Sequence, residues 1–562
     1  MIEMPPFLIF FLAGIVAAMS PHLIRATLTV MVPAISGALL LFTDLGNYFP
    51  YQIFDYRGEI YRFDELSRLF GYLFHIAALI GGIYALHIRD RIQQVSVFFY
   101  AGSALGAVMA GDLITLFIFW EIAAISSVSL IWARRKMRSY HSGMRYLIIQ
   151  ILSGVLLLIG CVILLGKNGD ATFGYIGTGS IAGWFILSAF GIKAAFPFVH
   201  NWLTDAYAEA TPTGTVFLSA FTTKLAIYAL ARGYPGADVL IYIGMIMTAF
   251  PIFYAVIEND LRRVLGYSMI NQLGFMVCGI GIGTELAING AVAHAFNDVI
   301  FKGLLFMSMG AVLHMTGKIN GSDLGGLYKS MPITTVLCVV GAASISAFPL
   351  FSGFVSKSMV MSAALSEGYL EIWLVLLFAS AGVFHHAGIK IPYFAFFAHD
   401  SGLRTSEPPF NMLAAMTVAA LLCIGIGCFP QHLYSILPFD TGYWPFDATH
   451  VIAQVQILFF SALAFVWLQL YGVYPPELRS VNLDAEWTYR RFVPDLWLSV
   501  LGGVRLRANQ MLQFSSRVLG WLHDQILASH GPGGGLSRSW STGNMILWVL
   551  LLLSVYLLFN FT

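Results

Sequence analysis

The chain has 562 residues, of which 58% are hydrophobic and only 10% are charged, and its formal net charge at pH 7 is +1. This composition is too apolar for a soluble globular protein, and a near-neutral chain without a basic patch gives no support for nucleic-acid binding. About 16 apolar segments are each long enough to cross a hydrocarbon core about 30 Å thick. The sequence therefore predicts an all-α, multi-pass membrane protein with spans near 5–24, 27–43, 66–87, 94–110, 112–133, 145–166, 182–203, 211–232, 238–257, 263–284, 287–314, 331–366 (broken), 370–397, 409–430, 449–472 and 544–561.

The first apolar run has no basic residue before it, so we interpret it as a span and not as a cleaved signal. All five cysteines lie inside predicted spans and none has C-x-x-C spacing, which argues against an iron–sulfur or zinc framework. No glycine-rich nucleotide-binding motif follows a strand. We therefore expect no cofactor, no metal ion, and no redox or hydrolytic site of the chain's own.

Basic residues are concentrated in the loops that follow odd-numbered spans. The strongest cluster, ARRKMRSYHSGMR, follows the fifth span, and pairs of arginines follow the third span (Arg89, Arg91) and the ninth (Arg262, Arg263). Because cytoplasmic loops carry the excess of Lys and Arg, these loops are expected in the cytoplasm and the N-terminus outside.

The segment 473–543 is the one long stretch near the C-terminus that is not predicted to span. It carries seven arginines, and within it leucine, valine and tryptophan alternate with arginine at helical spacing. This pattern is typical of an amphipathic helix along the membrane face or along partner subunits. A loosely attached interfacial tail is the alternative, and both interpretations remain open. The glycine-rich sequence GPGGGLSRS separates this segment from the last span.

Several predicted spans contain ionisable residues. A charge at the bilayer centre costs about 2.5–3.5 kcal/mol on the insertion scale, so such residues are functional candidates by default. Those that lie well inside predicted spans form our candidate path for proton or ion translocation: Glu121, Lys193, Lys224, His294, Asp298, Lys302 and Lys357.

His294, Asp298 and Lys302 are spaced four residues apart, so they share one helix face over about two turns. Three titratable groups on one face could pass a proton stepwise. The alternative is purely structural, with an Asp298–Lys302 ion pair beside a hydrogen-bonded histidine.

Glu121 and Lys193 could form a switch. Burial favours the neutral form of a lysine, whereas a nearby carboxylate favours the charged form. Movement of Glu121 relative to Lys193 would therefore change the lysine between holding and releasing a proton. By contrast, His385, His386 and Lys390 lie near the end of a predicted span, and for them we favour snorkelling or interface contact.

Two spans carry the same interruption, AFP, with prolines at Pro197 and Pro349. Proline breaks a helix, and the freed backbone groups are tolerated in a membrane only when buried in protein or lining a wet cavity. Transporters place such broken helices at their ion sites, in inverted repeats. The prolines lie in spans seven and twelve, which cross in opposite directions. Because Lys193 precedes its proline and Lys357 follows its own, the pattern predicts two inverted five-helix units.

Residues 90–400 resemble the antiporter-like subunits of respiratory complex I (NADH–quinone oxidoreductase) and of Mrp-type sodium/proton antiporters. The resemblance rests on motifs in order along the chain: DLITLFIFWE, KAAFPFVHNWLTDAYAEATPTG, TTKLAIYAL, DLRRVLGYSMINQLGFM, HAFNDVIFKGLLF and FPLFSGFVSK. Asp298 and Gln272 stand where some members carry histidine, which puts a place in an ordinary complex I in doubt.

By this resemblance, Glu121 pairs with the broken-helix Lys193, and Lys224 connects it to a central relay of His294 and Lys302. Lys357 would then be the terminal lysine of the second half-channel. The resemblance further implies about 14 core helices, divided into N-terminal helices (1–90), two half-channels (91–235 and 236–400), C-terminal helices (401–472), an amphipathic lateral segment (473–543) and a final helix (544–562).

The implied function is a proton- or sodium/proton-translocating membrane subunit of a complex I-like or Mrp-like assembly, in a prokaryotic plasma (inner) membrane among lipids and other membrane subunits. The driver could be a redox module, as in an NADH–quinone oxidoreductase or hydrogenase, or a sodium gradient. The alternative is a proton-supplying membrane subunit of an inorganic-carbon uptake complex. A structural scaffold with vestigial charges has no need of so many embedded lysines.

Overall fold

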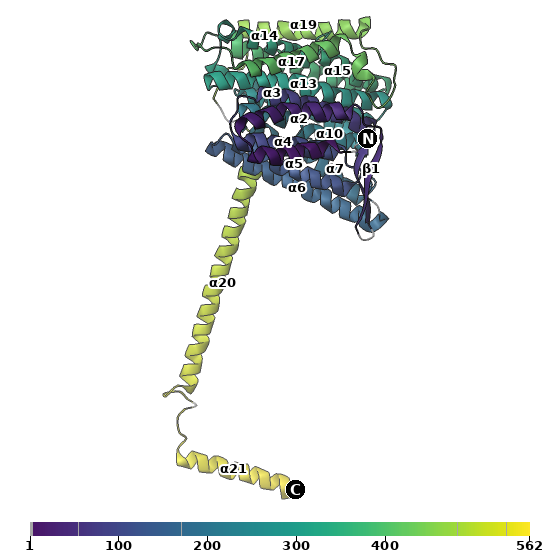
Figure 1. Ribbon diagram of the computed structural model, residues 1–562. Helices are drawn as coiled ribbons and strands as arrows, with labels where there is room; N and C mark the ends of the chain where they lie inside the picture. Colours follow the sequence, from purple (N-terminus) through teal and green to yellow (C-terminus); the bar gives the residue numbers. More distant parts are fainter. Residues whose placement is uncertain (1–3, 54–55, 170, 480–481, 536, 562) are drawn as a thin grey trace. The chain divides into compact units, whose positions relative to one another are not determined.

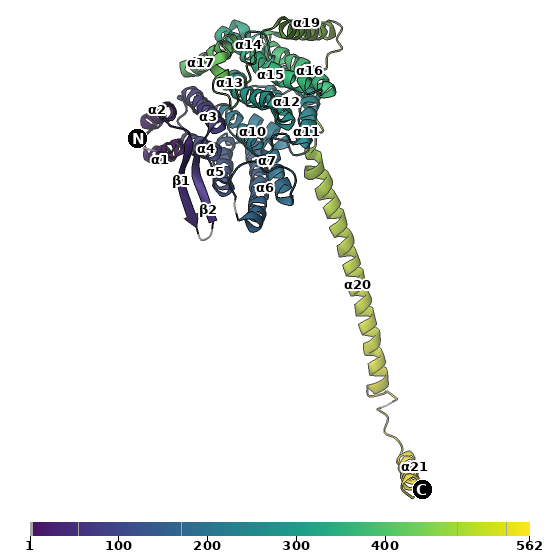
Figure 2. The same ribbon diagram turned by 90° about the vertical axis from the view of Figure 1, so that its right-hand side faces the viewer.

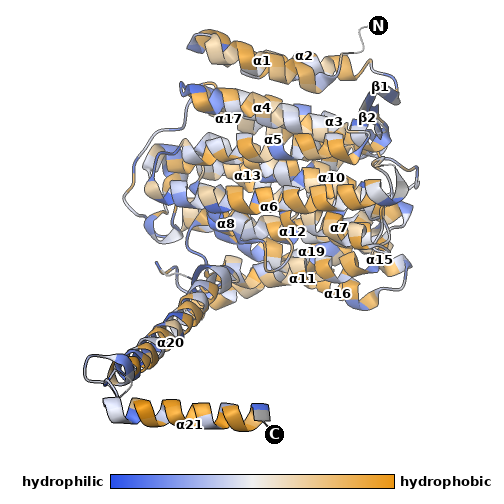
Figure 3. Cartoon of the chain, turned by 90° about the horizontal axis from the view of Figure 1, so that it is seen from below, coloured by the Kyte–Doolittle hydropathy of each residue, from blue (hydrophilic) through white to orange (hydrophobic). Residues whose placement is uncertain are grey.

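The computed structural model describes residues 4–53, 56–169, 171–479, 482–535 and 537–561. The described chain forms two compact units, Met1–Asp484 and Ala485–Thr562. The first unit is a bundle of helices (Figure 1), and hydrophobic residues occupy much of the length of these helices (Figure 3).

In chain order the helices of the first unit are α1 (Pro6–Met19), α2 (His22–Leu40), α3 (Glu65–Tyr84), α4 (Arg91–Val108), α5 (Leu113–Trp132), α6 (Met137–Asn168), α7 (Ile181–Lys193), α8 (Asn201–Glu209), α9 (Pro212–Ala220), α10 (Thr222–Gly233), α11 (Asp238–Ile257), α12 (Leu261–Ile282), α13 (Glu285–Thr316), the short η1 (Gly321–Asp323) and η2 (Leu327–Lys329), α14 (Pro332–Ile345), α15 (Ser352–Ser366), α16 (Leu370–Val383), the π-helical η3 (Phe384–Lys390) and η4 (Tyr393–Phe397), α17 (Phe410–Cys428), α18 (Gln431–Tyr434) and α19 (Ala448–Leu470).

The predicted all-α, multi-pass architecture is confirmed. Twelve helices of the described residues are long and apolar enough to cross a membrane, and three shorter apolar helices accompany them. Each of the 16 predicted spans corresponds to one helix or to two or three consecutive helices. The division into repeats and the segment boundaries within the chain remain predictions.

One element was not predicted. A two-stranded antiparallel hairpin, β1 (Gly46–Ile53) and β2 (Tyr56–Phe63), lies at one edge of the bundle (Figure 2). It is joined to the turn between α4 and α5 by backbone hydrogen bonds from Gly111 N to Glu59 O (3.0 Å) and from Arg62 N to Met109 O (2.7 Å). The aromatic-rich sequence NYFPYQI is the signal that could have indicated it.

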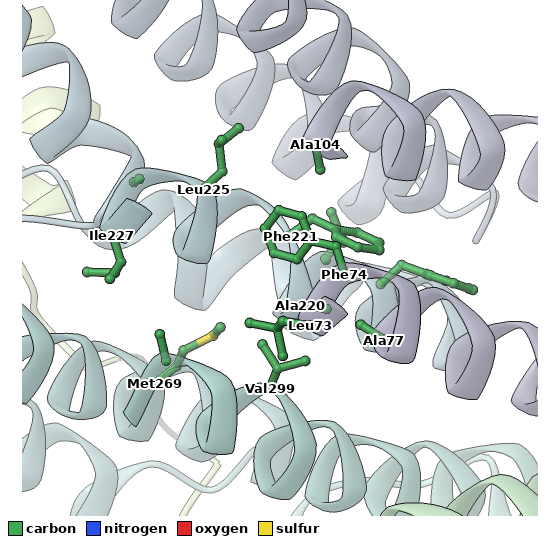
Figure 4. Packing of buried hydrophobic residues seen from close by; sticks show 14 of the residues in the cluster. Leu73, Phe74, Ala77, Ala104, Ala220, Phe221, Leu225, Ile227, Met269 and Val299 are labelled. Carbon is green, nitrogen blue, oxygen red and sulfur yellow. The ribbon is translucent and has the colours of Figure 1, made fainter. Parts of the chain in front are cut away.

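The core around α10 is built from aromatic and aliphatic side chains of several helices (Figure 4). Phe221 lies edge-on to Phe74 of α3, with ring centroids 5.3 Å apart, and edge-on to Tyr100 of α4 at 5.1 Å. Such aromatic pairs are worth about 0.5–1.5 kcal/mol beyond their area burial. They hold the start of α10, and therefore Lys224, in one position.

The second unit contains a π-helical turn, η5 (Thr488–Phe492), followed by α20 (Val493–His530) and α21 (Thr542–Phe561). The predicted helix within 473–543 is therefore present, and it is 38 residues long. None of its side chains is buried within the unit. Whether it lies along a membrane or along partner subunits remains a prediction.

Candidate functional site

The two AFP interruptions have the same backbone conformation. Ala195 and Phe198 adopt positive φ angles of 60° and 70°, and Ala347 and Leu350 adopt 57° and 71°. At each break the N–H of the phenylalanine before proline donates to a carbonyl five residues back, Gly191 O (2.9 Å) or Ala343 O (3.0 Å). Both breaks therefore separate paired half-helices, α7 from α8 and α14 from α15. The same break in the helix therefore occurs at two places 152 residues apart, as the spacing of Pro197 and Pro349 predicted.

Ala195 is strained, because the left-handed region costs an L-residue about 1–2 kcal/mol and costs glycine nothing. We expect Ala195→Gly to raise the free energy of unfolding by about 0.5–1 kcal/mol. The adjacent Ala194 has φ −77° and serves as the matched control, because glycine there should instead lower stability. Denaturation of the purified protein in detergent measures both, and equal shifts in the same direction would contradict the strain.

Lys193 ends α7 directly before the first break and is only 1% exposed. Its Nζ donates to Trp120 O (2.8 Å) on α5 and lies 4.5 Å from the centre of the Trp120 ring. Glu121 is the next residue on α5, and its Oε1 has no hydrogen-bond partner among the described residues. A side chain on Gly154 of α6 would overlap this carboxylate, so the glycine leaves room for it. Glu121 is thus held near Lys193 but is not hydrogen-bonded to it.

Lys224 and Asp298 form a fully buried ion pair. The distance from Lys224 Nζ to Asp298 Oδ2 is 2.6 Å, and both side chains are 0% exposed. Lys224 also donates to Ser219 O (3.1 Å), at the interruption between α9 and α10. The Asp298–Lys302 pair that we weighed as a structural alternative is not formed, because α13 directs the carboxylate across to α10.

His294 and Lys302, which share a face of α13 with Asp298, contact α12 and α15. Lys302 Nζ donates to Ser268 Oγ (2.8 Å). The His294 ring lies between Gln272 Oε1 (3.1 Å) and Ser356 Oγ (3.0 Å). Both residues are completely buried, as their common helix face predicted. Sequence reasoning passed over Ser268 and Ser356, although their polar side chains inside apolar spans were a usable signal.

Lys357 lies in the half-helix that follows the second break and is 1% exposed. Its Nζ donates to Ile345 O (2.8 Å), at the end of the half-helix that precedes the break, and lies 5.2 Å from the centre of the Phe275 ring. Ile345 stands 152 residues after Lys193, which is the spacing of the two prolines. The Lys357 side chain therefore reaches across its break to the position that corresponds to Lys193 at the first break.

Lys390 corrects a prediction. We interpreted it, with His385 and His386, as a snorkelling or interfacial group, but the side chains of Lys390 and His386 are 0% exposed. Lys390 Nζ forms an ion pair with Glu477 (2.9 Å) and donates to the carbonyls of Val256 and Glu258. The reason is tertiary, because the chain after α19 folds back over this end of the helix.

That returning chain, residues 473–479 and 482–484, is here called the strap. Burial raises the pKa of its Glu477 carboxyl, against the effect of the Lys390 charge. Asp484 Oδ2 accepts hydrogen bonds from Asn201 (2.7 Å) of α8 and from Tyr267 (2.7 Å) of α12. The strap therefore joins the first predicted half-channel to the second.

We expect Glu477→Gln to release the strap, because removing one partner of a buried pair costs about 3–5 kcal/mol. Limited trypsin digestion of the full-length protein, followed by mass spectrometry of cleavage after Arg479, measures this release. Asp400→Asn is the control, since Asp400 pairs with Arg404 on the surface and its loss should leave cleavage unchanged. Equal protection of Arg479 in wild type and Glu477→Gln would contradict the expectation.

Comparison with known proteins matches residues 110–385 to the family described as NADH:quinone oxidoreductase/Mrp antiporter, TM. One component of a probable K(+)/H(+) antiporter of Rhizobium meliloti (strain 1021) is 30% identical over 400 residues, which cover 66% of this chain and 40% of the relative. A component of the Na(+)/H(+) antiporter of Alkalihalophilus pseudofirmus is 29% identical over 428 residues, covering 66% and 53%. The chain spans about half the length of the curated relatives it matches.

Two solved structures share the fold. A chain of the archaeal membrane-bound sulfane sulfur reductase superposes with a TM-score of 0.71 at 21% identity, covering 98% of this chain and 99% of that chain. A chain of the Mrp complex from Dietzia sp. DQ12-45-1b superposes with a TM-score of 0.69 at 20% identity, covering 82% and 97%. Both structures are multisubunit assemblies by their descriptions. The matched region 110–385 contains all seven candidate residues, namely Glu121, Lys193, Lys224, His294, Asp298, Lys302 and Lys357.

Proposed function

We propose that this chain translocates protons within a larger membrane complex, because it belongs to the NADH:quinone oxidoreductase/Mrp antiporter family of membrane subunits. The single observation that carries the proposal is the buried row of ionisable groups between the two helix breaks. In order, the row consists of Lys193 with Glu121, Lys224 with Asp298, Lys302 with His294, and Lys357.

The row can pass protons because each of its four lysines is buried and has a polar partner. An intramembrane lysine needs a carboxylate, a backbone carbonyl or water to hold its charge. Lys224 has the first, Lys193 has the carbonyl of Trp120 in α5, and Lys357 has the carbonyl of Ile345, which is freed at the second break. Serine and glutamine side chains beside His294 and Lys302 supply hydrogen-bond partners for both protonation states.

Glu121 would act as the switch of the first half-channel. Its Oε1 has no hydrogen-bond partner among the described residues, so it is free to move toward the Lys193 ammonium. Approach would favour the charged lysine, and withdrawal would favour proton release toward Lys224. The Asp298 carboxylate would then hold the proton on Lys224 until His294 and Lys302 accept it.

The orientation that we propose places the basic loops and the strap in the cytoplasm, and it places the C-terminal end of α15 and the start of α19 outside. Partners would be other membrane subunits of a complex I-like or Mrp-like assembly, in a prokaryotic plasma membrane. Sodium or potassium would be the exchanged ion in an Mrp-like assembly, and a redox module would be the driver in a complex I-like one.

The test is purification of the full-length chain with its partners, mass spectrometry of the co-purifying subunits, and proton flux in vesicles that contain the complex. Proton movement on addition of Na⁺ or K⁺ would support exchange, and movement on addition of NADH or hydrogen would support a redox driver. Co-purification of a large zinc-binding protein would favour the inorganic-carbon alternative. A complex whose vesicles move no protons under any of these conditions would contradict the proposal.

A further inference from the structure

A cavity of about 120 Å³ adjoins Lys357 between α15, α16 and α19. A cavity of this volume has room for several water molecules, provided that polar groups are present to hold them. Most of the lining is aliphatic or aromatic, and the polar side chains on it are Lys357, Ser358, Ser362, Thr449, His450 and Gln454. Of the row of groups described above, only Lys357 lines this cavity.

The cavity follows one stripe of α15. Phe354, Lys357, Met361 and Leu365 all line it, and this spacing of three to four residues is that of a single helix face. At 1.5 Å per residue, the stripe from Phe354 to Leu365 extends about 16 Å along the helix axis. The cavity therefore leads from the second helix break toward the end of α15.

The opposite wall is the first part of α19, and it places a polar side chain at each end. At the break, Gln454 Nε2 donates to Ser346 O (3.0 Å), beside Ala347. At the other end, His450 Nε2 lies 3.0 Å from Ser362 Oγ. Ser362 Oγ also lies 3.2 Å from the hydroxyl of Tyr443.

His450 reaches the surface of the protein. Its Nδ1 lies 2.6 Å from Asp447 Oδ2, and the two side chains are 33% and 48% exposed. Asp447 is the N-cap of α19 and accepts a hydrogen bond from His450 N (2.8 Å). The hydrogen bond from this backbone N–H also lowers the pKa of the Asp447 carboxyl. The imidazole thus lies between the cavity and a surface carboxylate.

We propose that this cavity is a water-filled path for protons between Lys357 and the membrane face at which α15 ends, with His450 and Asp447 as its terminal pair. The inference rests on the proposed function and extends it to a complete exit route. Under the proposed orientation this is the outer face. Histidine suits the position because its unperturbed pKa lies near neutral pH, so it can accept and release protons readily.

One proton crosses the path in each transfer. The Nζ–H bond of the Lys357 ammonium breaks, and the proton passes through cavity water, assisted by the Ser362 hydroxyl, to Nε2 of the neutral His450. Lys357 becomes neutral and His450 becomes an imidazolium, which the Asp447 carboxylate stabilises. The imidazolium then returns a proton to bulk water, and Lys357 is recharged from the central row.

Cysteine labelling tests the path itself. In a Cys428→Ser background, Ser362→Cys should react with a membrane-impermeant, cationic methanethiosulfonate added from the outer face, and the label should block proton flux. Ala364→Cys is the matched control, because Ala364 lies on the same helix but off the cavity and is 0% exposed. Absence of Ser362→Cys labelling from either face, or equal labelling of Ala364→Cys, would overturn the proposal.

The terminal pair is tested by chemical rescue in vesicles that contain the full complex. We expect His450→Ala to slow proton flux by about 100-fold, and external 4-methylimidazole to restore it. His432→Ala is the control and should leave flux unchanged, because His432 is an exposed histidine of α18.

Full flux in His450→Ala would overturn this proposal alone if Lys193→Ala still abolishes flux. Full flux in Lys193→Ala would instead overturn the proposed function. A slow His450→Ala that 4-methylimidazole does not rescue would also count against the path.

Discussion

Replacement of Asp298 by asparagine should both destabilise the protein and stop proton flux. The substitution leaves the fully buried Lys224 ammonium without its carboxylate, and breaking a buried pair in this way costs about 3–5 kcal/mol. The relay also loses the group that holds a proton on Lys224. Unfolding in detergent measures the first effect, and proton flux in vesicles containing the complex measures the second.

A double variant separates structure from function at this pair. In Lys224→Met with Asp298→Leu, apolar side chains of similar volume replace both charges, which is often neutral or stabilising. We expect stability to return to within about 1 kcal/mol of wild type while flux stays absent. Restored flux in this double variant would show that the Lys224–Asp298 pair is only structural.

Replacement of Lys193 by alanine should reduce proton flux by about 100-fold, the scale of removing a positioned proton-transfer group. The fold should survive, because the charge and the need to solvate it are removed together. Glu121→Gln should give a similar loss, since an amide cannot change the proton affinity of the lysine as a carboxylate does. Flux is measured in vesicles, and assembly is measured by co-purification of the partner subunits.

Lys167→Ala is the matched control for this prediction, because Lys167 lies exposed at the end of α6. Gly154→Ala offers a second approach that leaves both charged residues in place. The new methyl group would overlap the Glu121 carboxylate and displace it, so flux should fall although the titratable groups are unchanged. Normal flux in assembled Lys193→Ala would exclude the lysine from the path.

The membrane architecture, the two helix breaks and the candidate residues of the buried row could all be predicted from the sequence. These features depend on local properties, namely the length of apolar runs, the missing N–H of proline and the cost of a charge in hydrocarbon. The burial of Lys193, Lys224 and Lys357 follows from the same cost, because a lysine in the middle of a span must face the protein interior.

Which groups meet could not be predicted in this way, because it depends on how the helices pack. The four-residue spacing of Asp298 and Lys302 allowed a local ion pair, but the carboxylate pairs with Lys224, 74 positions earlier in the chain. Lys390 looked interfacial because nothing in its own segment covers it, and the strap that supplies Glu477 follows only after α19. The cavity from Lys357 to His450 likewise depends on where α19 packs. Contacts between distant segments are set by packing of the whole bundle, and no local pattern specifies them.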